Sequence, residues 1–300
     1  MLNITILGSS GSAPTKERNL PSIAVQINGD VLLLDCGEGT QRQMMKHGVS
    51  YAKVKAIFIS HLHLDHFLGI FGLGETLRLS GRTTPIQIFG PPGTARVLYS
   101  FGHRDLFNIH EISKKNCSKT KPIFSLHNHE VFCFLVSHGK RMNAFGFAIK
   151  EKDKYRFYEE KAKYFGIHGP LFSKIQKEGK LKINKKTIKL KDVTYLQKGK
   201  KITYSGDTMY SKTITNAAKN SDLLIHDCTL DDEKHLLAKE KYHSTPSDGA
   251  KCAKKANAKK LLLFHLSGRY SKDSKILLEQ AKKIFKNTEV AYDGMKLELK

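Results

Sequence analysis

The sequence predicts an α/β fold in which helices pack against the outer faces of sheets. Apolar runs of three to six residues recur along the chain and end at polar or glycine-rich turns, a pattern typical of buried strands. Stretches with helical spacing lie between these runs in both halves of the chain, as expected of a layered architecture. A chain of 300 residues fits one large layered domain or two smaller ones.

The predicted strands and helices alternate along the chain. The expected strands are Ile4–Leu7, Ile23–Ile27, Val31–Leu34, Val54–Ile59, Ile86–Phe89, Val131–Val136, Ile202–Tyr204, Leu223–Ile225 and Leu261–Phe264. The expected helices are Gly69–Leu79, Thr94–Phe101, Ser211–Lys219, Pro246–Asn257 and Asp273–Phe285. The fourth of these helices has the clearest start, because Thr245 can cap it and Pro246 suits the first helical position.

The charge is strongly positive and unevenly distributed. Lysine and arginine number 51 against 28 acidic residues, a net charge of +23. Residues 150–201 contribute +11 of it and residues 251–300 contribute +8. Such an excess favours a polyanionic partner such as nucleic acid, although a general preference for lysine on solvated surfaces would give the same total.

Residues 151–200 interrupt the strand and helix pattern and are rich in lysine, glutamate and aromatic residues. Lys161–Tyr164 and Leu171–Lys177 are expected to form short helices on either side of a turn at Gly169–Pro170. Neither helix has enough apolar residues to form a core alone, so we expect an inserted arm and not an independent domain.

The composition also limits the cellular setting. No apolar run approaches the roughly 20 residues of a membrane span, and the first residues read as a strand and not as a secretion signal. The five cysteines are odd in number and lack C-x-x-C spacing, which indicates neither a disulfide framework nor a thiolate metal site. A cytoplasmic protein without a membrane partner is expected.

A cluster of metal-ligand residues directly follows the strand at 54–59. It reads His61, His63, Asp65 and His66, four ligand types within six positions. In an extended loop His61 and His63 point the same way, and the chain turning into the helix at Gly69 redirects the other two towards a second centre. The pattern therefore indicates two metal ions.

Three further ligand residues follow other predicted strands, namely His138, Asp207 and His265. Ligands at strand ends converge readily, and together the set supplies five imidazoles and two carboxylates, with Asp207 as a possible bridge. This donor set favours zinc over Mg²⁺ or Ca²⁺, while Mn, Fe or Co could occupy the same ligands. Two such ions about 3.5–4 Å apart activate water and clamp a phosphodiester, which predicts hydrolysis.

Hydrolysis of a phosphodiester also needs a proton for the leaving oxygen. His243, just before the helix at Pro246, is a candidate general acid, and Asp227 at the end of a predicted strand could orient it. A purely structural role at the helix entry is the alternative for His243. The remaining histidines have no comparable context and are expected to be structural: His47, His103, His110, His127, His129, His168, His226 and His235.

These motifs resemble a known superfamily. His61-Leu-His-Leu-Asp-His66 with the later His138, Asp207 and His265 resembles the metallo-β-lactamase superfamily, which implies a four-layer αββα sandwich with a dinuclear metal cleft. Within it the motifs are similar to those of the ribonuclease Z family of tRNA 3′-processing endonucleases. They are Pro14-Thr-Lys16-Glu-Arg18-Asn19, Ser205-Gly-Asp207-Thr, His243-Ser-Thr and the Gly169-Pro170 turn of the arm. The resemblance spans nearly the whole chain.

The resemblance implies a role for each matching residue. One zinc would be held by His61, His63 and His138, the other by Asp65, His66 and His265, with Asp207 bridging. Asp65 would assist the nucleophile, and His243 would protonate the leaving 3′-oxygen. The family supports that histidine with the glutamate of an H-E-A-T motif, where this chain has His226-Asp227-Cys228-Thr229, so the shorter Asp227 takes the place of that glutamate.

The resemblance also implies the substrate contacts and the assembly. Lys16 and Arg18 would hold the acceptor stem, and the basic arm around Gly169 and Pro170 would grip the tRNA elbow of a precursor tRNA in a homodimer. The arm departs from the usual G-x-P-x-G-P pattern, since it reads Gly-Ile-His-Gly-Pro. Two other functions share the same ligands: hydrolysis of a small molecule, and RNA binding without catalysis.

Overall fold

The computed structural model describes residues 2–100, 104–118, 120–140, 142–183 and 186–299. The chain divides into two compact units. Unit 1 comprises residues 1–150 and 200–300, and unit 2 comprises residues 151–199.

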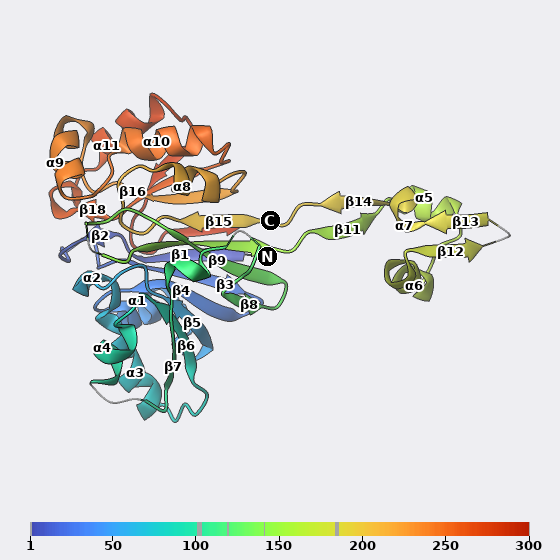
Figure 1. The fold of residues 1–300 in the computed structure, drawn as a ribbon, viewed down its shortest axis with the longest axis horizontal. Coiled ribbons are helices and arrows are strands. Elements are labelled where there is room, and N and C mark those ends of the chain that lie inside the picture. The colour runs from blue at the N-terminus through green and yellow to red at the C-terminus, as the bar shows by residue number, and fades with distance from the viewer. Residues whose placement is uncertain (1, 101–103, 119, 141, 184–185, 300) are drawn as a thin grey trace. The chain divides into compact units, whose positions relative to one another are not determined.

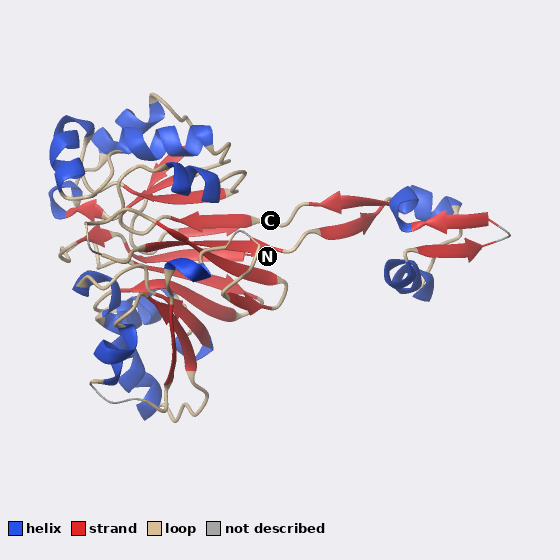
Figure 2. Ribbon diagram, viewed as in Figure 1, coloured by secondary structure: helices blue, strands red, loops and turns tan. Residues whose placement is uncertain are grey.

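Two sheets form the centre of unit 1, each with seven strands among the described residues (Figures 1 and 2). The first runs in the order β20 (Lys296–Leu299), β1 (Leu2–Gly8), β3 (Ser22–Ile27), β4 (Asp30–Cys36), β5 (Val54–Phe58), β6 (Ile86–Gly90) and β7 (Phe107–Glu111). The second runs in the order β19 (Thr288–Val290), β17 (Leu261–Phe264), β16 (Leu223–Asp227), β15 (Lys201–Tyr204), β10 (Phe145–Glu151), β9 (His129–Leu135) and β8 (Phe124–Leu126).

Alternating side chains on these strands create the layers. In β4, Leu32 and Leu34 face the core between the two sheets, whereas Val31 and Leu33 face the helices outside. The outer core of the first sheet is shared with α1 (Thr40–His47), α3 (Gly69–Leu79) and α4 (Thr94–Tyr99). The second sheet is covered by α8 (Lys212–Ala217), α9 (His235–Glu240), α10 (Pro246–Lys255) and α11 (Lys275–Lys282). The predicted four-layer αββα sandwich is confirmed.

Short elements connect the layers. They are β2 (Ser10–Gly11), which pairs with β18 (Leu266–Ser267), the short helix α2 (Leu64–Phe67), and 3₁₀ turns at Tyr51–Lys53, Lys114–Asn116, Asp232–Lys234 and Gly268–Tyr270. Among the described residues, no helix combines the length and apolar character that crossing a membrane requires.

Every strand predicted from an apolar run is present, with its ends shifted by at most two residues. The helix expected at 273–285 is shorter, as α11, and Phe101 at the end of another predicted helix lies outside the described residues. The strands that the sequence analysis did not predict are short, polar at the edges, or interrupted by glycine. Thus β7 alternates apolar and polar residues, and Gly146 divides the apolar run of β10.

Unit 2 begins and ends with the antiparallel pair β11 (Lys154–Phe157) and β14 (Thr194–Gln197). Beyond this ribbon lie α5 (Glu159–Tyr164), α6 (Pro170–Glu178), the hairpin of β12 (Lys180–Ile183) and β13 (Lys186–Lys189), and α7 (Leu190–Val193). The two predicted helices are present. They share a small core with the hairpin, which the sequence analysis did not predict: Ala162, Ile167, Ile175, Leu181, Ile188 and Val193.

The aromatic residues of unit 2 divide into two groups. Phe157 and Phe172 pack against each other beside the small core, with ring centroids 4.8 Å apart. Tyr164 lies on the surface, 79% exposed.

Gly169 has a φ of +48°, a backbone conformation that is strained in residues with a side chain. It directly precedes Pro170, the first residue of α6.

Candidate metal centre

The seven predicted ligand residues come from loops that follow strands of both sheets. His61 lies beyond β5, His138 beyond β9, Asp207 beyond β15, and His265 directly after β17. Since β15, β16 and β17 are parallel, their carboxyl ends share one edge of the sheet. The short helix α2 turns Asp65 and His66 back towards this edge.

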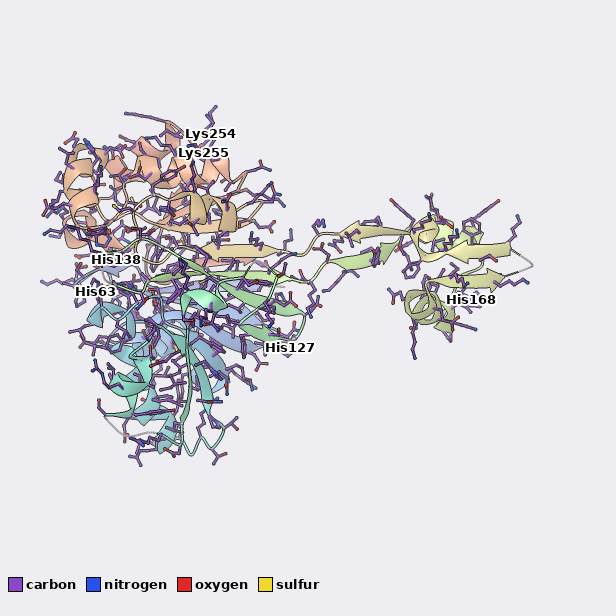
Figure 3. All side chains as sticks on the ribbon, viewed as in Figure 1. His63, His127, His138, His168, Lys254 and Lys255 are labelled. Carbon is purple, nitrogen blue, oxygen red and sulfur yellow. The ribbon has the colours of Figure 1, made fainter. Side chains whose placement is uncertain are left out.

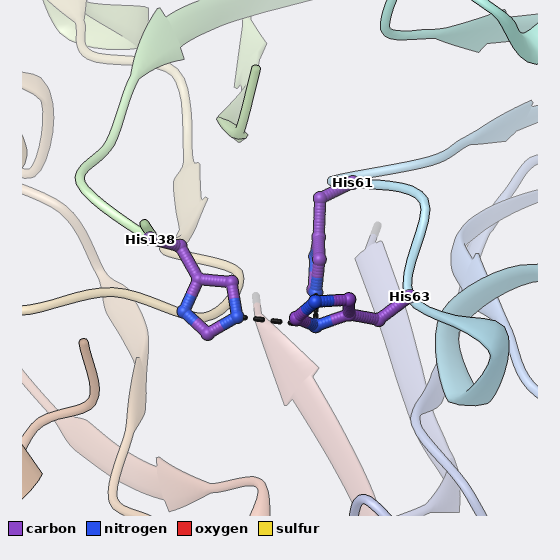
Figure 4. Close-up of side chains that lie close together, drawn as sticks. All are labelled: His61, His63 and His138. Atoms are coloured by element: carbon purple, nitrogen blue, oxygen red, sulfur yellow. Dashed lines mark hydrogen bonds between the residues drawn. The ribbon is translucent and has the colours of Figure 1, made fainter. Parts of the chain in front are cut away.

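His61, His63 and His138 form a first cluster (Figure 4). The Nδ1 atom of His63 lies 3.0 Å from Nε2 of His61 and 3.2 Å from Nε2 of His138. Two imidazole ligands at usual zinc distances and tetrahedral angles would lie about 3.4 Å apart. The three nitrogens therefore have the spacing of ligands on one ion.

Asp65, His66 and His265 form a second cluster. Oδ2 of Asp65 lies 3.5 Å from Nε2 of both histidines. The Asp207 carboxylate lies between the clusters, because its Oδ2 is 3.1 Å from Nε2 of His265 and 3.3 Å from Nε2 of His66. The same oxygen is 3.8 Å from Nε2 of His61, in the first cluster.

Two buried atoms of these clusters test whether a cation fits. Oδ1 of Asp207 and Nε2 of His66 are among the buried side-chain atoms of the described residues that have no hydrogen-bond partner. An unsatisfied buried polar atom costs about 1–3 kcal/mol, and a metal ligand bond removes that cost. Imidazoles with few carboxylates suit borderline-soft divalent ions. The residues present therefore fit divalent metal ions.

The carboxylates of the site are held in the charged form. Burial alone would raise the pKa of Asp207, but the electrostatic effect of the neighbouring His265 and His66 rings brings that pKa well below its ordinary value. Burial would also raise the pKa of Asp65, but its contacts with His265 and His66 lower that pKa. Both groups are thus acceptors for a cation.

Asp35 is a buried part of the site that the sequence analysis missed. Its carboxylate accepts hydrogen bonds from the Ser60 amide at 2.7 Å, the Tyr204 hydroxyl at 2.6 Å and Nδ1 of His66 at 2.7 Å. The last bond keeps the proton of His66 on Nδ1 and leaves Nε2 for the cluster. Asp35 directly follows a predicted strand, the same signal that identified His138, Asp207 and His265.

His243 and Asp227 lie beside the clusters. Nδ1 of His243 is 2.9 Å from Oδ2 of Asp227, which also accepts from the Thr208 amide at 2.9 Å. Burial works against the charged imidazole, but the charge and hydrogen bond of Asp227 raise the pKa of His243 to about 9. The pair thus keeps a protonated imidazole next to the metal ligands at neutral pH.

A cleft of about 660 Å³ opens over these residues. Its lining includes His63, His138, Asp207 and His243, and two cationic side chains, Lys241 and Arg269, also line it. The cleft therefore combines candidate metal ligands, a candidate proton donor and positive charge.

Comparisons with known proteins place this site in a family. A family model described as "Anti-Pycsar protein Apyc1" matches residues 2–159, and one described as "Beta-lactamase superfamily domain" matches residues 192–266. A ribonuclease Z of Archaeoglobus fulgidus is 40% identical over 307 aligned residues that cover 100% of this chain and 98% of that protein. The chain belongs to the ribonuclease Z family.

Solved structures agree with this membership. The crystal structure of human tRNase Z, short form, matches with a TM-score of 0.70 and 28% identity and covers 99% of this chain and 98% of that one. The metallo-β-lactamase fold protein YhfI of Bacillus subtilis matches with a TM-score of 0.72 at 17% identity, over 99% of this chain and 98% of that chain, which supports the fold alone. As a ribonuclease Z family member with this fold, the chain is an endonuclease that hydrolyses phosphodiesters.

Two residues of the ribonuclease Z motif near the N-terminus have different surroundings. Lys16 is exposed and lines, with Arg42 and Lys46, a cavity of about 430 Å³. Arg18 is buried, and its Nη1 donates to Ser9 Oγ at 2.7 Å and to the Ala291 carbonyl. These bonds attach the loop to the rest of unit 1. Arg18 also lines the cavity beside Lys16, and its expected RNA contact stays a prediction.

Of the histidines expected to be structural, none that the structure describes belongs to a group of candidate metal ligands. Figure 3 shows His63 and His138 close together, with His127 elsewhere in unit 1. His127 Nε2 is 2.8 Å from Oδ2 of Asp30. His103 lies outside the described residues.

Replacement of Asp227 by asparagine tests the origin of the His243 charge. Without the carboxylate, burial dominates, and the pKa of His243 should fall from about 9 to below 6.5. Nuclear magnetic resonance titration of the imidazole, in protein stripped of metal by a chelator, measures this, with His243→Gln identifying the signal. Because the folded pKa lies above the unfolded value, stability from this pair is present below pH 6.5 and is lost as the pH rises through about 9. If the titration midpoint of His243 in Asp227→Asn equals that of the wild type, Asp227 is not the origin of the His243 charge.

Proposed function

We propose that the chain is a zinc-dependent endoribonuclease that removes the 3′ trailer from precursor tRNA, leaving a 3′-hydroxyl on the tRNA and a 5′-phosphate on the trailer. The observation that carries this proposal is the 40% identity to a ribonuclease Z, which covers the whole chain and so includes the basic unit 2 as well as the clusters. A hydrolase for small molecules has no need of such a unit.

Two zinc ions per subunit fit the ligand clusters. His61, His63 and His138 would hold one, Asp65, His66 and His265 the other, and the central carboxylate of Asp207 would contact both. Mn, Fe or Co could substitute. When bound, the ions supply an activated water and an electrostatic clamp for the phosphate oxygens.

The side chains around the ions direct the proton transfers. Asp65 accepts a hydrogen bond from the Ser12 amide at 2.8 Å, which fixes its carboxylate to orient the attacking water and take its proton. Attack at phosphorus breaks the bond to the 3′-oxygen of the tRNA. His243 donates its Nε2 proton to that leaving oxygen, while Asp227 holds Nδ1 and stabilises the charged ring.

Unit 2 would bind the tRNA through its positive charge. Residues 151–199 carry 14 lysine and arginine residues against 6 acidic residues, and Gly169 and Pro170 shape the turn that starts α6. Lysines that neutralise phosphates add affinity without reading sequence. We give the same role at the acceptor stem to Lys16, which is exposed on unit 1. We further propose a homodimer in the cytoplasm, where the free cysteines are stable.

Incubation of the purified protein with a 3′-extended tRNA is the decisive experiment. We expect one cut near the 3′ end of the mature tRNA, with a 3′-hydroxyl on the tRNA and a 5′-phosphate on the released trailer, both identified by end-specific labelling. A chelator should abolish the cut and added zinc restore it, and Asp65→Ala should be inactive. Binding without any cleavage by the zinc-loaded protein would favour the non-catalytic alternative.

Deletion of residues 152–198 tests unit 2. Lys154 and Gln197 are paired in the ribbon, so a short glycine linker between Glu151 and Gly199 can close the gap. Loss of the phosphate contacts should reduce kcat/KM for precursor tRNA by about 100-fold or more at 150 mM salt. Hydrolysis of bis(p-nitrophenyl) phosphate, which is too small to need unit 2, is the control and should stay within twofold. Unchanged tRNA cleavage would refute this role.

Replacement of His243 by alanine tests the proton donor. Loss of a general acid should lower kcat for precursor tRNA by about 10²–10⁴-fold. Metal content, measured by atomic emission, should stay equal to that of the wild type, because His243 is not among the proposed ligands. His235→Ala removes an exposed histidine of α9 and is the matched control, with unchanged kcat. Loss of metal from His243→Ala would make His243 a ligand instead.

A further inference from the structure

Thr229 contacts three groups of the site through one hydroxyl. Its Oγ1 lies 2.7 Å from Oδ1 of Asp227, 2.9 Å from Nδ1 of His265 and 3.0 Å from Nδ1 of His243. Thr229 is only 7% exposed and its hydroxyl lies between two imidazole rings that stack with centroids 5.3 Å apart. The hydroxyl thus joins a proposed metal ligand to the proposed proton donor and its carboxylate.

Proton counting gives each of these contacts a direction. A hydroxyl donates one hydrogen bond and accepts two. The ionised Asp227 can only accept, so the Thr229 proton points to Asp227 and the lone pairs of Oγ1 face the two histidines. The single Nδ1 proton of His243 is shared between Asp227 Oδ2 and Thr229 Oγ1. His265 must then carry its proton on Nδ1, which leaves Nε2 unprotonated and directed at Asp207, 3.1 Å away.

The other buried candidate ligands have comparable supports on the ring nitrogen that faces away from the clusters. His66 Nδ1 donates to Asp35, and His138 Nδ1 donates to the Tyr242 carbonyl at 3.0 Å. His61 Nδ1 lies 3.0 Å from Ser60 Oγ, which itself donates to Asp35. Thr229 supports His265 in the same way, but it also contacts His243. Removal of the Thr229 hydroxyl therefore affects a proposed ligand and the proposed proton donor together.

We propose that Thr229 is a positioning residue that fixes the Nδ1-protonated form of His265 and thereby sets the affinity of one of the two metal positions. The inference rests on the proposed function, because it takes His265 as a metal ligand. Such a hydrogen bond to a ligating imidazole orients the ring and is worth 10–100-fold in metal affinity. Through the same oxygen, Thr229 keeps His243 aligned with Asp227.

Zinc titration of Thr229 variants tests the inference. Thr229→Val keeps the shape of the side chain but has no hydroxyl, and Thr229→Ala removes the hydroxyl without a branched replacement. Competition with a chromophoric chelator gives the two zinc dissociation constants. In both variants one constant should rise by about 10–100-fold and the other should stay within threefold of the wild type. In the zinc-saturated enzyme, kcat should fall by at least tenfold with KM for precursor tRNA within threefold.

Two further variants separate positioning from packing. Thr229→Ser restores a hydroxyl, so both zinc constants and kcat should return to within threefold of the wild type. Thr288→Val removes another buried threonine hydroxyl, which donates to the Phe285 carbonyl at 2.6 Å, and should change stability alone. Circular dichroism identifies folded variants, and a Thr229→Val protein that does not fold leaves the comparison to Thr229→Ala and Thr229→Ser.

The outcomes distinguish this inference from the proposed function. Wild-type protein that binds no zinc overturns both. Wild-type protein that binds two zinc ions, with both constants unchanged in Thr229→Val or Thr229→Ala, overturns the inference alone. An equal loss at both metal positions, or a loss that Thr229→Ser does not restore, assigns Thr229 a general packing role and overturns it as well.

Discussion

The Asp207 carboxylate is the group around which the candidate metal centre is arranged. It is 2% exposed and one oxygen lies within 3.9 Å of Nε2 atoms from four histidines. A buried carboxylate surrounded by buried imidazoles is costly unless charges and hydrogen bonds are matched, because desolvation opposes every charged form. Divalent ions held between these groups would balance the carboxylates and satisfy the nitrogens at once.

The scaffold maintains this arrangement by unusual backbone geometry and close packing. Asp35 and His265 have φ angles of +56° and +61°, a left-handed conformation that residues with side chains seldom adopt. Gly11 of β2 lies so close to the His265 ring that an added Cβ would be 2.5 Å from its Cε1 atom. The pairing of β2 with β18 therefore brings the backbone of Gly11 against the His265 ring. A residue with a side chain at position 11 would clash with that ring.

Much of the fold and of the candidate site could be predicted because both follow from short local patterns. The apolar runs predicted the central strands. The position of His138, Asp207 and His265 just after such runs made them candidate ligands. What could not be predicted depends on contacts between distant segments. Arg18 reads as a surface cation, but its guanidinium binds the carbonyl of Ala291 across the fold. The core of unit 2 arises only when two short helices combine with a hairpin.

The same distinction explains why the supporting residues Asp35 and Thr229 were missed while the proposed ligands were predicted. A histidine in H-x-H-x-D-H has few structural explanations, whereas a threonine or an aspartate after a strand has many. Thr229 acquires its importance from His265 and His243, which lie 36 and 14 residues further along the chain. Hydrogen-bond supports of this kind are recognised only after the ligands are placed. The four buried histidines among the proposed ligands each have a partner on the opposite ring nitrogen, which is the usual arrangement of histidines that bind a metal.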